Sequence, residues 1–237
     1  MAQKVKSTPC ELCINRRKSL LKDVPDEALC KLSQSKKTIA HKKGQILFLE
    51  GTQPMGLFCI SKGHVKVFKT DDSGREQIVK LAKEGEFLGY RALLSEDNYN
   101  SSAAIIDEAE VCFIPKSSFT DLVAKDTDFQ NKLMQAVCND LGVMEQKMAD
   151  MANKNVRQRL ATTLLMLKSS YGVENEGFTD IEIALAREDI AKIVGTATES
   201  VIRLLSDFKK EGLIEFKGKK IRVLDTEGLA KEIDLFA

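Results

Sequence analysis

The sequence predicts an α+β fold: a β-rich sandwich or barrel, then a long helix, then a helix-turn-helix followed by a β-hairpin. Short β-rich runs separated by glycine-containing turns fill residues 36–115, which is typical of sandwiches and barrels. Residues 127–153 keep a helical spacing of apolar side chains, with no proline and one glycine, Gly142. Residues 187–210 contain two short amphipathic segments separated at Gly195, which predicts two helices joined by a tight turn.

Length, hydropathy and charge limit what this chain can be. The chain has 237 residues, 43% of them hydrophobic, so it can bury one large core or two smaller ones. No stretch approaches the roughly 18 apolar residues of a membrane span, and the N-terminus lacks an apolar signal region. We therefore expect a soluble, cytoplasmic protein with no membrane partner. The formal net charge of +1 does not by itself indicate a nucleic-acid partner, but residues 203–222 carry seven basic residues against three acidic ones.

The N-terminal segment, residues 1–35, begins polar and basic and then contains leucines around the sequence DVPDEA. This sequence is a turn and helix-start signal, and either Asp23 or Asp26 could begin the helix. We expect a cap helix that packs on the β-rich domain. Within that domain, the sequence DDSG at 71–74 predicts a hairpin turn, and Pro115 is expected to close the last strand.

The long helix over 127–153 carries a row of apolar residues at spacings of four and three, which is nearly a heptad repeat. Two explanations fit this row: the helix lies on the β-rich domain, or it pairs with a second copy of the chain. We favour a parallel dimer helix, because the segment joins two domains and is rich in methionine at the positions that would face a partner. The row consists of Leu133, Val137, Leu141, Met144, Met148 and Met151.

The remaining segments predict a winged helix. Residues 155–171 form an amphipathic helix that is followed by an acidic loop at 173–177 and a short strand at 178–183. The first helix of the helix-turn-helix follows Ala186, a poor capping residue. After the second helix, two β-rich runs alternate around a basic turn at 217–219, which would lie beside a duplex as a wing.

The second helix of the helix-turn-helix has one apolar and one polar face. Its apolar residues share one side at helical spacing, namely Val201, Leu204, Leu205 and Phe208. The opposite side presents Thr196, Glu199, Ser200, Arg203, Ser206 and Lys210. Arginine and glutamate can bond to base edges in the major groove, whereas lysines hold phosphates. The candidate DNA-binding residues are Thr198, Glu199, Ser200, Arg203 and Lys219.

The order of these segments, together with the sequence ESVIRLLSDFKKEGLIEFKGKKI at 199–221, resembles the CRP/FNR superfamily of bacterial transcription regulators. The resemblance covers nearly the whole chain and is strongest to the fumarate–nitrate reductase regulator branch. It implies that Glu199 and Arg203 read a palindromic half-site. The oxygen-sensing member has serine immediately before that arginine, whereas this chain has Ile202.

The resemblance also implies a domain organisation. Residues 1–35 would form the N-terminal segment and cap helix, and 36–115 a double-stranded β-helix of the cyclic-nucleotide-binding jelly-roll type that acts as sensor. Residues 116–153 would form a hinge and dimerisation helix, and 154–237 the winged-helix DNA-binding domain. A homodimer implies a pseudo-palindromic operator with half-sites one helical turn apart. Activation would involve contact with RNA polymerase.

Cyclic AMP is not the expected signal. Cyclic-nucleotide-binding members of the family resemble one another in a Gly-Glu pair and an Arg-Ser pair that hold the ribose hydroxyl and the cyclic phosphate. This chain keeps the glycine and the serine but has Tyr90 and Asn100 where the two charges belong. A buried phosphate without a guanidinium partner would be costly. Arg91, one residue further on, could serve another anion or be solvated.

An iron–sulfur cluster is a second candidate signal. The oxygen-sensing branch has C-x2-C-x5-C near the N-terminus and a distant cysteine in a strand. Cys10, Cys13 and Cys112 match three of these four positions, and Ser19 occupies the other. Cys30 could replace it only if the cap helix unwound or changed its position.

The alternative that we favour for the cysteines is structural. It has small buried thiols at Cys59, Cys112 and Cys138 and a solvent-exposed C-x2-C pair. We predict no mononuclear metal site, because the only imidazoles, His41 and His64, lack ligand spacing to that pair.

A third explanation is regulation by abundance or by an apolar ligand in the β-roll. No catalytic motif is present, so we do not expect an enzyme. The expected function is that of a dimeric, sequence-specific transcription regulator that responds to an unidentified signal. The alternative function is a redox or metal sensor that uses Cys10, Cys13 and Cys112 and acts through protein contacts.

Overall fold

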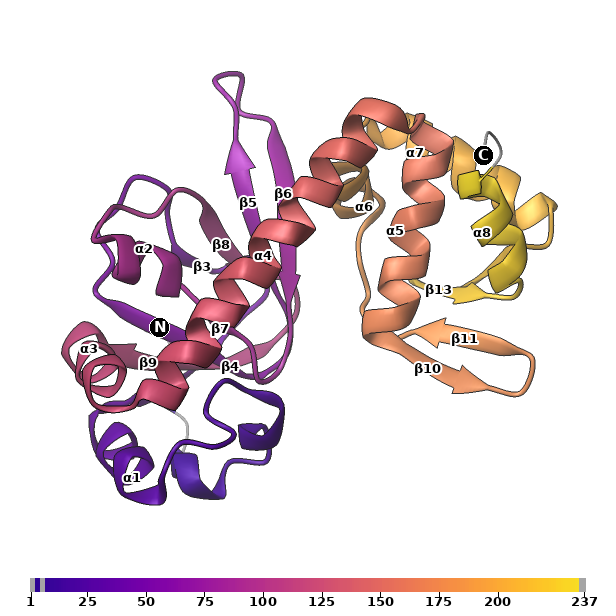
Figure 1. Ribbon diagram of the computed structural model, residues 1–237. Coiled ribbons are helices and arrows are strands. Elements are labelled where there is room, and N and C mark those ends of the chain that lie inside the picture. The colour runs from indigo at the N-terminus through magenta and orange to yellow at the C-terminus, as the bar shows by residue number, and fades with distance from the viewer. Residues whose placement is uncertain (1–2, 5–6, 235–237) are drawn as a thin grey trace. The chain divides into compact units, whose positions relative to one another are not determined.

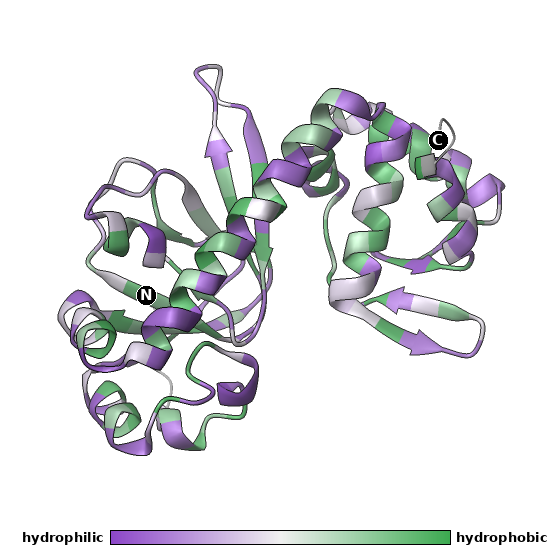
Figure 2. Cartoon of the chain, in the orientation of Figure 1, coloured by the Kyte–Doolittle hydropathy of each residue, from purple (hydrophilic) through white to green (hydrophobic). Residues whose placement is uncertain are grey.

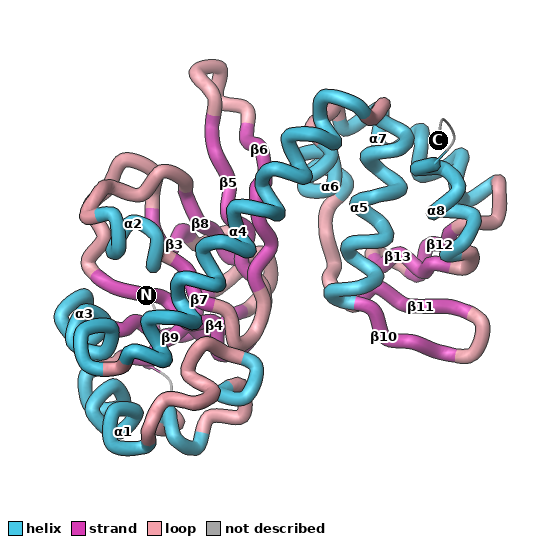
Figure 3. The backbone as a smooth tube through the Cα atoms, viewed as in Figure 1, coloured by secondary structure: helices cyan, strands magenta, loops and turns pink. Residues whose placement is uncertain are grey.

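The computed structural model describes residues 3–4 and 7–234. The chain forms two compact units, Met1–Gly142 and Val143–Ala237, and the boundary between them lies inside a long helix. Figure 1 shows the elements of each unit in chain order, and Figure 3 separates helices from strands. Among the described residues, none of the helices is both long enough and apolar enough to cross a membrane.

The N-terminal unit contains two antiparallel sheets, as the predicted β-rich domain requires. One sheet has the order β1-β2-β9-β4-β7, and the other has the order β3-β8-β5-β6. The strands are β1 (Gln3–Lys4), β2 (Lys37–His41), β3 (Ile46–Phe48), β4 (Gly56–Lys62), β5 (Val65–Thr70), β6 (Glu76–Ala82), β7 (Phe87–Leu88), β8 (Ser102–Ile105) and β9 (Ala109–Pro115). The fold-class prediction is confirmed for this unit, and β9 ends at Pro115 as predicted.

Alternation along β4 and β9 divides the unit into two apolar clusters. Successive side chains of a strand point to opposite faces, so Ile60 and Val111 enter the core between the sheets. Leu57 and Ile114 point to the other face, where they meet the helical elements. Cys59 packs against that second cluster, so its side chain lies on the same face of the sheet as Ile114.

The outer face of the sheet that contains β4 and β9 is covered by helical elements from both ends of the unit. They are the 3₁₀ turns η1 (Cys10–Leu12) and η2 (Arg16–Lys18), and the helices α1 (Asp26–Ser35) and α3 (Lys116–Lys125). The predicted cap helix is confirmed, and of its two possible starts the structure has Asp26. Leu29 and Leu32 of α1 are buried in the same cluster as Ile114. A short helix, α2 (Tyr90–Ser95), follows β7.

The long helix α4 (Thr127–Asn153) has the predicted bounds, but the apolar row on it needs correction. Leu133 is buried in the N-terminal unit and Val137 packs partly against the same cluster, so this end of the helix lies on its own domain. The exposed apolar residues begin one position later, with Met134, and continue with Leu141, Met148 and Met151. Figure 2 shows hydrophobic and hydrophilic segments alternating along α4.

The C-terminal unit is the predicted winged helix. Its helices are α5 (Val156–Tyr171), α6 (Arg187–Val194), α7 (Thr198–Lys210) and α8 (Thr226–Asp234). Its four-stranded sheet has the order β10-β11-β13-β12, from β10 (Gly172–Asn175), β11 (Phe178–Ile181), β12 (Ile214–Lys217) and β13 (Lys220–Val223). Asn155 begins α5 with a capping box completed by Gln158.

Two segments of this unit differ from their predictions. The acidic stretch 173–177, expected as a loop, contributes most of strand β10, because Val173 pairs with Asp180 across an antiparallel ladder. The following strand ends at Ile181 instead of residue 183. Gly172 ends α5 with an extended backbone, and a Cβ there would collide with the carbonyl of Lys168. The glycine is therefore needed for close approach of helix and strand.

An ion pair joins the central strands of the wing sheet. Arg222 donates from Nε to Asp180 Oδ1 at 2.7 Å, and its guanidinium lies over the Phe178 ring at 3.7 Å. Asp180 is 9% exposed. The hydrogen bond from Arg222, followed by the charges of Arg222 and Lys217, lowers the pKa of Asp180. The carboxylate is thus stabilised in its ionised form in the folded unit.

Asp180→Asn is expected to lower the free energy of unfolding at neutral pH, because Arg222 loses its charged acceptor. The folded-state pKa is depressed, so the contribution is complete above the unfolded value of about 3.9 and is lost as the pH falls through the folded value. Urea unfolding of both proteins from neutral pH down to about pH 3 should show the difference shrinking. Glu215→Gln is the control, since Glu215 meets the same guanidinium at 3.3 Å but is half exposed. A difference that is independent of pH would contradict this account.

Candidate functional site

The turn between α6 and α7 is fixed by a glycine and by an arginine from α5. Gly195 ends α6 with φ of 73°, a left-handed conformation that side chains other than glycine adopt at a cost. Arg159 of α5 donates from Nε to the carbonyl of Val194 at 3.0 Å and from Nη2 to that of Gly195 at 3.4 Å. These bonds satisfy carbonyls that the end of a helix leaves unpaired. The angle between α6 and α7 is therefore fixed by the left-handed backbone of Gly195 and by the hydrogen bonds from Arg159 of α5.

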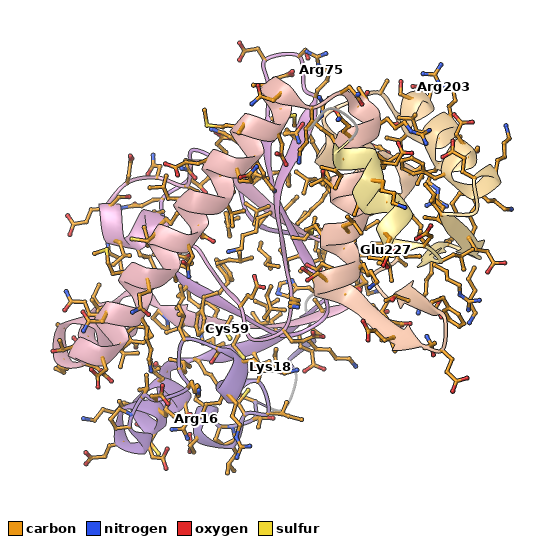
Figure 4. All side chains as sticks on the ribbon, turned by 45° about the vertical axis from the view of Figure 1, so that its right-hand side comes forward. Arg16, Lys18, Cys59, Arg75, Arg203 and Glu227 are labelled. Atoms are coloured by element: carbon orange, nitrogen blue, oxygen red, sulfur yellow. The ribbon has the colours of Figure 1, made fainter. Side chains whose placement is uncertain are left out.

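Burial of one side of α7 leaves the other side for a partner. Val201, Leu205 and Phe208 are buried, which confirms the predicted apolar face, while Leu204 is half-buried. Glu199 and Arg203 are exposed, and neither has a hydrogen bond or ion pair to another described residue. Figure 4 shows Arg203 pointing outward from the ribbon. The arrangement offers an unpaired carboxylate and an unpaired guanidinium one helical turn apart.

Three further residues extend this surface. Thr198 and Ser200, at the N-terminal end of α7, are half-buried. Ala197 precedes the helix and provides no side-chain cap, so the first N–H groups of α7 are free to meet an anion. Ile202 lies between Glu199 and Arg203 in the sequence and is 49% exposed, which places an apolar group beside the two charges.

The wing turn carries three lysines, of which one is free. Lys217 lies 3.7 Å from Asp180, and Lys220 pairs with Glu182. Lys219 is exposed and has no hydrogen bond or ion pair within the described part of the chain. Gly218, with φ of 61°, forms the turn between them. The structure therefore leaves the ammonium group of Lys219 exposed to solvent.

An arginine that the sequence analysis did not identify supports the end of α7. Arg157 of α5 donates to Glu232 of α8 at 2.6 Å and to Glu211 at 2.5 Å, and its guanidinium lies 4.6 Å from the Phe208 ring centroid. These partners lie 54 and 75 residues away in the sequence. Helical periodicity carries no information about such distant pairs.

Tyr90 and Asn100 of the N-terminal unit occupy the positions where cyclic-nucleotide-binding regulators have a glutamate and an arginine, and here they make other contacts. Tyr90 is buried and donates its hydroxyl to Asp140 of α4, and Lys80 donates to the same carboxylate at 2.9 Å. Burial, and then the bond to Asp140, raises the pKa of Tyr90. Asn100 is exposed and accepts a hydrogen bond from Arg91 at 3.1 Å. The side chain that replaces the glutamate is thus part of a contact with α4.

Four thiols line one small cavity of the N-terminal unit. They are the predicted Cys10, Cys13 and Cys112, together with Cys59, and Ser19, Arg16 and Lys36 line the same cavity. Desolvation raises the pKa of the thiols of Cys59 and Cys112, so both are protonated at neutral pH. Figure 4 shows the labelled Arg16, Lys18 and Cys59 in the same part of the unit.

Several cysteine predictions are corrected by this arrangement. The C-x2-C pair is not solvent-exposed, because Cys10 is buried and Cys13 half-buried. Cys138, expected to be buried, is exposed, and Cys30 is exposed on α1 away from the cavity. From the sequence alone, Cys59 is expected only as a small buried thiol. The strand alternation that places Cys59 and Cys112 on one face of the sheet could have indicated their proximity.

Comparison with known proteins agrees with both units. The model of the cyclic nucleotide-binding domain family matches residues 38–126, and that of the Crp-like helix-turn-helix domain matches residues 158–232. The chain is similar to the transcriptional activator protein FnrA of Stutzerimonas stutzeri, with 28% identity over 188 residues, which are 79% of this chain and 77% of the relative.

A second relative and two solved structures extend the likeness over the chain. The CRP-like cAMP-activated global transcriptional regulator of Mycobacterium tuberculosis is 25% identical over 215 residues, which are 91% of this chain and 96% of the relative. A CooA mutant from Carboxydothermus hydrogenoformans superposes with a TM-score of 0.74 at 18% identity, covering 97% of both chains. FixK2 from Bradyrhizobium japonicum gives 0.73 at 23% identity, covering 83% of this chain and 96% of that one. The chain therefore belongs to the CRP/FNR family of transcription regulators.

Proposed function

We propose that this protein is a homodimer that reads a palindromic operator through Glu199 and Arg203 of each copy. The observation that carries the proposal is the exposed, unpaired state of these two side chains on a helix whose other face is buried. In the major groove, a guanidinium can bond the two acceptors of guanine, and a carboxylate can accept from the amino group of cytosine. A charged pair with no partner among the residues that the structure describes breaks no bond to those residues when it binds.

The apolar Ile202 supports a half-site that differs from that of the oxygen-sensing member. An exposed isoleucine next to Arg203 can contact the methyl group of thymine but cannot donate or accept a hydrogen bond. Lys219 on the wing and the N-terminal end of α7, with Thr198 and Ser200, would hold the phosphates. These contacts position the helix, and the two charges of α7 supply the base preference.

A row of apolar residues on α4, four of them exposed and two half-buried, supports the dimer. Starting from Met134, residues follow at spacings of three and four, as in a heptad repeat: Met134, Val137, Leu141, Met144, Met148 and Met151. Leu141 and Met148 are 59% and 73% exposed, which is unusual for large apolar residues so close together. A two-fold axis through this row would relate the α7 helices of the two copies and so require a palindromic operator.

We further propose that the signal is not cyclic AMP and that the protein acts on RNA polymerase in the cytoplasm. A relative is described as cAMP-activated, but the residues that would hold the nucleotide differ here. Tyr90 is buried against Asp140, and no guanidinium belongs to position 100. A cyclic phosphate would therefore meet an amide at position 100 in place of a guanidinium, and the nearby guanidinium of Arg91 is already bonded to that amide. Another relative is named a transcriptional activator, which supports an activating role.

Arg203→Ala and Lys219→Ala should weaken DNA binding in different ways. On a duplex selected by the wild-type protein, Arg203→Ala should cost about 1–3 kcal/mol and relax the preference at one position of each half-site. Lys219→Ala should weaken all duplexes alike and reduce the slope of log K against log salt by about 1 per chain. Fluorescence anisotropy over a series of single-base variants and salt concentrations measures both.

Arg75→Ala is the matched control, since Arg75 is an equally charged, 83% exposed residue of the β5–β6 hairpin and should not change base preference. Unchanged base preference in Arg203→Ala would overturn the assignment of the reading residue.

Leu141→Glu should separate the dimer. A carboxylate in an apolar seam between two helices should raise the dissociation constant of the dimer at least about tenfold. Val143→Glu is the control, because Val143 is 54% exposed on the same helix but lies off the row. Sedimentation equilibrium of the three proteins gives the comparison. If both substitutions raised the dissociation constant of the dimer equally, or if neither changed it, this row would not be the interface.

A further inference from the structure

We infer that Arg159 fixes the separation of the two α7 helices in the proposed dimer, so that the protein accepts a single half-site spacing. This inference rests on the proposed function, because it needs a dimer on an inverted repeat. Arg159 is a positioning residue in this account, since it acts on DNA through the backbone of two other segments. The segments are the link between α4 and α5, residues 154–155, and the turn between α6 and α7.

The guanidinium of Arg159 bonds carbonyls of both segments at once. Besides the carbonyls of Val194 and Gly195 at the end of α6, it bonds that of Lys154 in the link, which accepts from Nη1 at 2.8 Å. A guanidinium is planar and its N–H groups point in fixed directions, so the carbonyls that it holds keep fixed relative positions. The link is therefore tied directly to the turn that precedes α7.

Both residues of the link are held by further bonds. The ammonium of Lys154 lies 3.0 Å from Asp150 Oδ1 in the last turn of α4, and it donates to Thr162 Oγ1 of α5 at 3.3 Å. The N–H of Asn155 donates to Gln158 Oε1 at 2.9 Å, and Asn155 Oδ1 accepts from the N–H of Gln158 at 3.0 Å. The side chains of Lys154 and Asp150 are 22% and 15% exposed, so their ion pair is only partly screened by solvent. The link therefore cannot bend without breaking several of these bonds.

The C-terminal end of α4 belongs to the same compact unit as the link and α7. That unit begins at Val143, and it includes Met148 and Met151 of the apolar row, which are 73% and 42% exposed. In a two-fold dimer, the distance between two equivalent groups is set by the position of each group relative to the axis. With the axis beside Met148 and Met151, the position of α7 relative to the axis depends on the link and on the bonds of Arg159.

A rigid link makes the spacing of the half-sites matter. One base pair advances a half-site by about 3.4 Å along the duplex and turns it by about 35° around the axis of the duplex. A half-site moved by one base pair is therefore out of place for two α7 helices with a fixed separation. Binding then requires the link to bend or the DNA to be deformed, and both cost free energy. A wrong spacing is thus read as a loss of affinity.

The shape of the arginine side chain matters here more than its charge. A lysine ammonium is a compact point charge, so it cannot bond three separate carbonyls in this geometry. Its positive charge near the C-terminal end of α6 would still be favourable, as that of arginine is. Arg159→Lys therefore removes the connection between the two segments but keeps the charge, and with it the attraction to DNA phosphates.

Anisotropy titrations of the full-length protein with three duplexes of equal length test the inference. One duplex carries the inverted repeat selected by the wild type, and the others have one base pair more or one fewer between the same half-sites. The wild type should bind the selected spacing at least about tenfold more tightly than the others. Arg159→Lys should lower this ratio of dissociation constants at least about threefold, because the link can then adapt. A uniform loss of affinity cancels in the ratio.

Arg222→Lys is the matched control, because it makes the same replacement in the same unit. The hydrogen-bond and ring partners of Arg222 among the described residues lie in the wing sheet, so this variant should keep the wild-type ratio. Lys154→Met is a second test of the link. It removes the bonds to Asp150 and Thr162 and should lower the ratio as Arg159→Lys does.

Folded Arg159→Lys protein that keeps the wild-type ratio would overturn this inference alone. If that variant does not fold, a wild-type ratio in Lys154→Met has the same meaning. An equal fall of the ratio in Arg222→Lys would also overturn the inference, since general loss of stability would then explain the effect. Wild-type protein that binds all three spacings alike would overturn the proposed dimer on an inverted repeat as well.

Discussion

Val201, Leu205 and Phe208 are packed on one side of α7, and this burial decides which side chains the helix can offer to a partner. Burying each such side chain stabilises the unit by about 1.5–3 kcal/mol. Turning the helix by one residue would expose these groups and bury a charge such as Arg203, which would cost several kcal/mol more. Because the turn is also fixed by Gly195 and Arg159, the outward position of Glu199 and Arg203 is a consequence of packing.

The same relation between packing and availability holds on α4. The helix must cover the apolar cluster of its own unit at one end, so Leu133 is buried there. The apolar residues of this helix that the described part of the chain leaves exposed begin at Met134. Near the middle of the helix, Asp140 is occupied by Tyr90 and Lys80 from the β-rich unit. One helix therefore carries contacts to the β-rich unit and, on another side, a row of apolar residues that are partly or fully exposed.

Periodic segments could be predicted from the sequence, and pairings between distant segments could not. Helices α4 to α7 and the wing follow from spacing, from Asn155 and from the turn glycines. The sequence pattern places the first residue of the α4 row at Leu133, whereas the first exposed apolar residue is Met134. Both residues fit the same apolar pattern, so the sequence cannot distinguish them. Arg157, Arg159 and Cys59 were missed as site residues because their partners lie more than thirty residues away. Which of two apolar neighbours is buried, and which thiols meet, depends on tertiary packing.

We propose that two copies of α7 read two inverted half-sites. The most direct measurement is selection of duplexes from a random pool by the full-length protein, followed by sequencing of the retained DNA. The account predicts an inverted repeat whose half-site centres lie about 10–10.5 base pairs apart, or a multiple of this distance. Retention of duplexes with no shared sequence, or with a single half-site and no inverted copy, would contradict it.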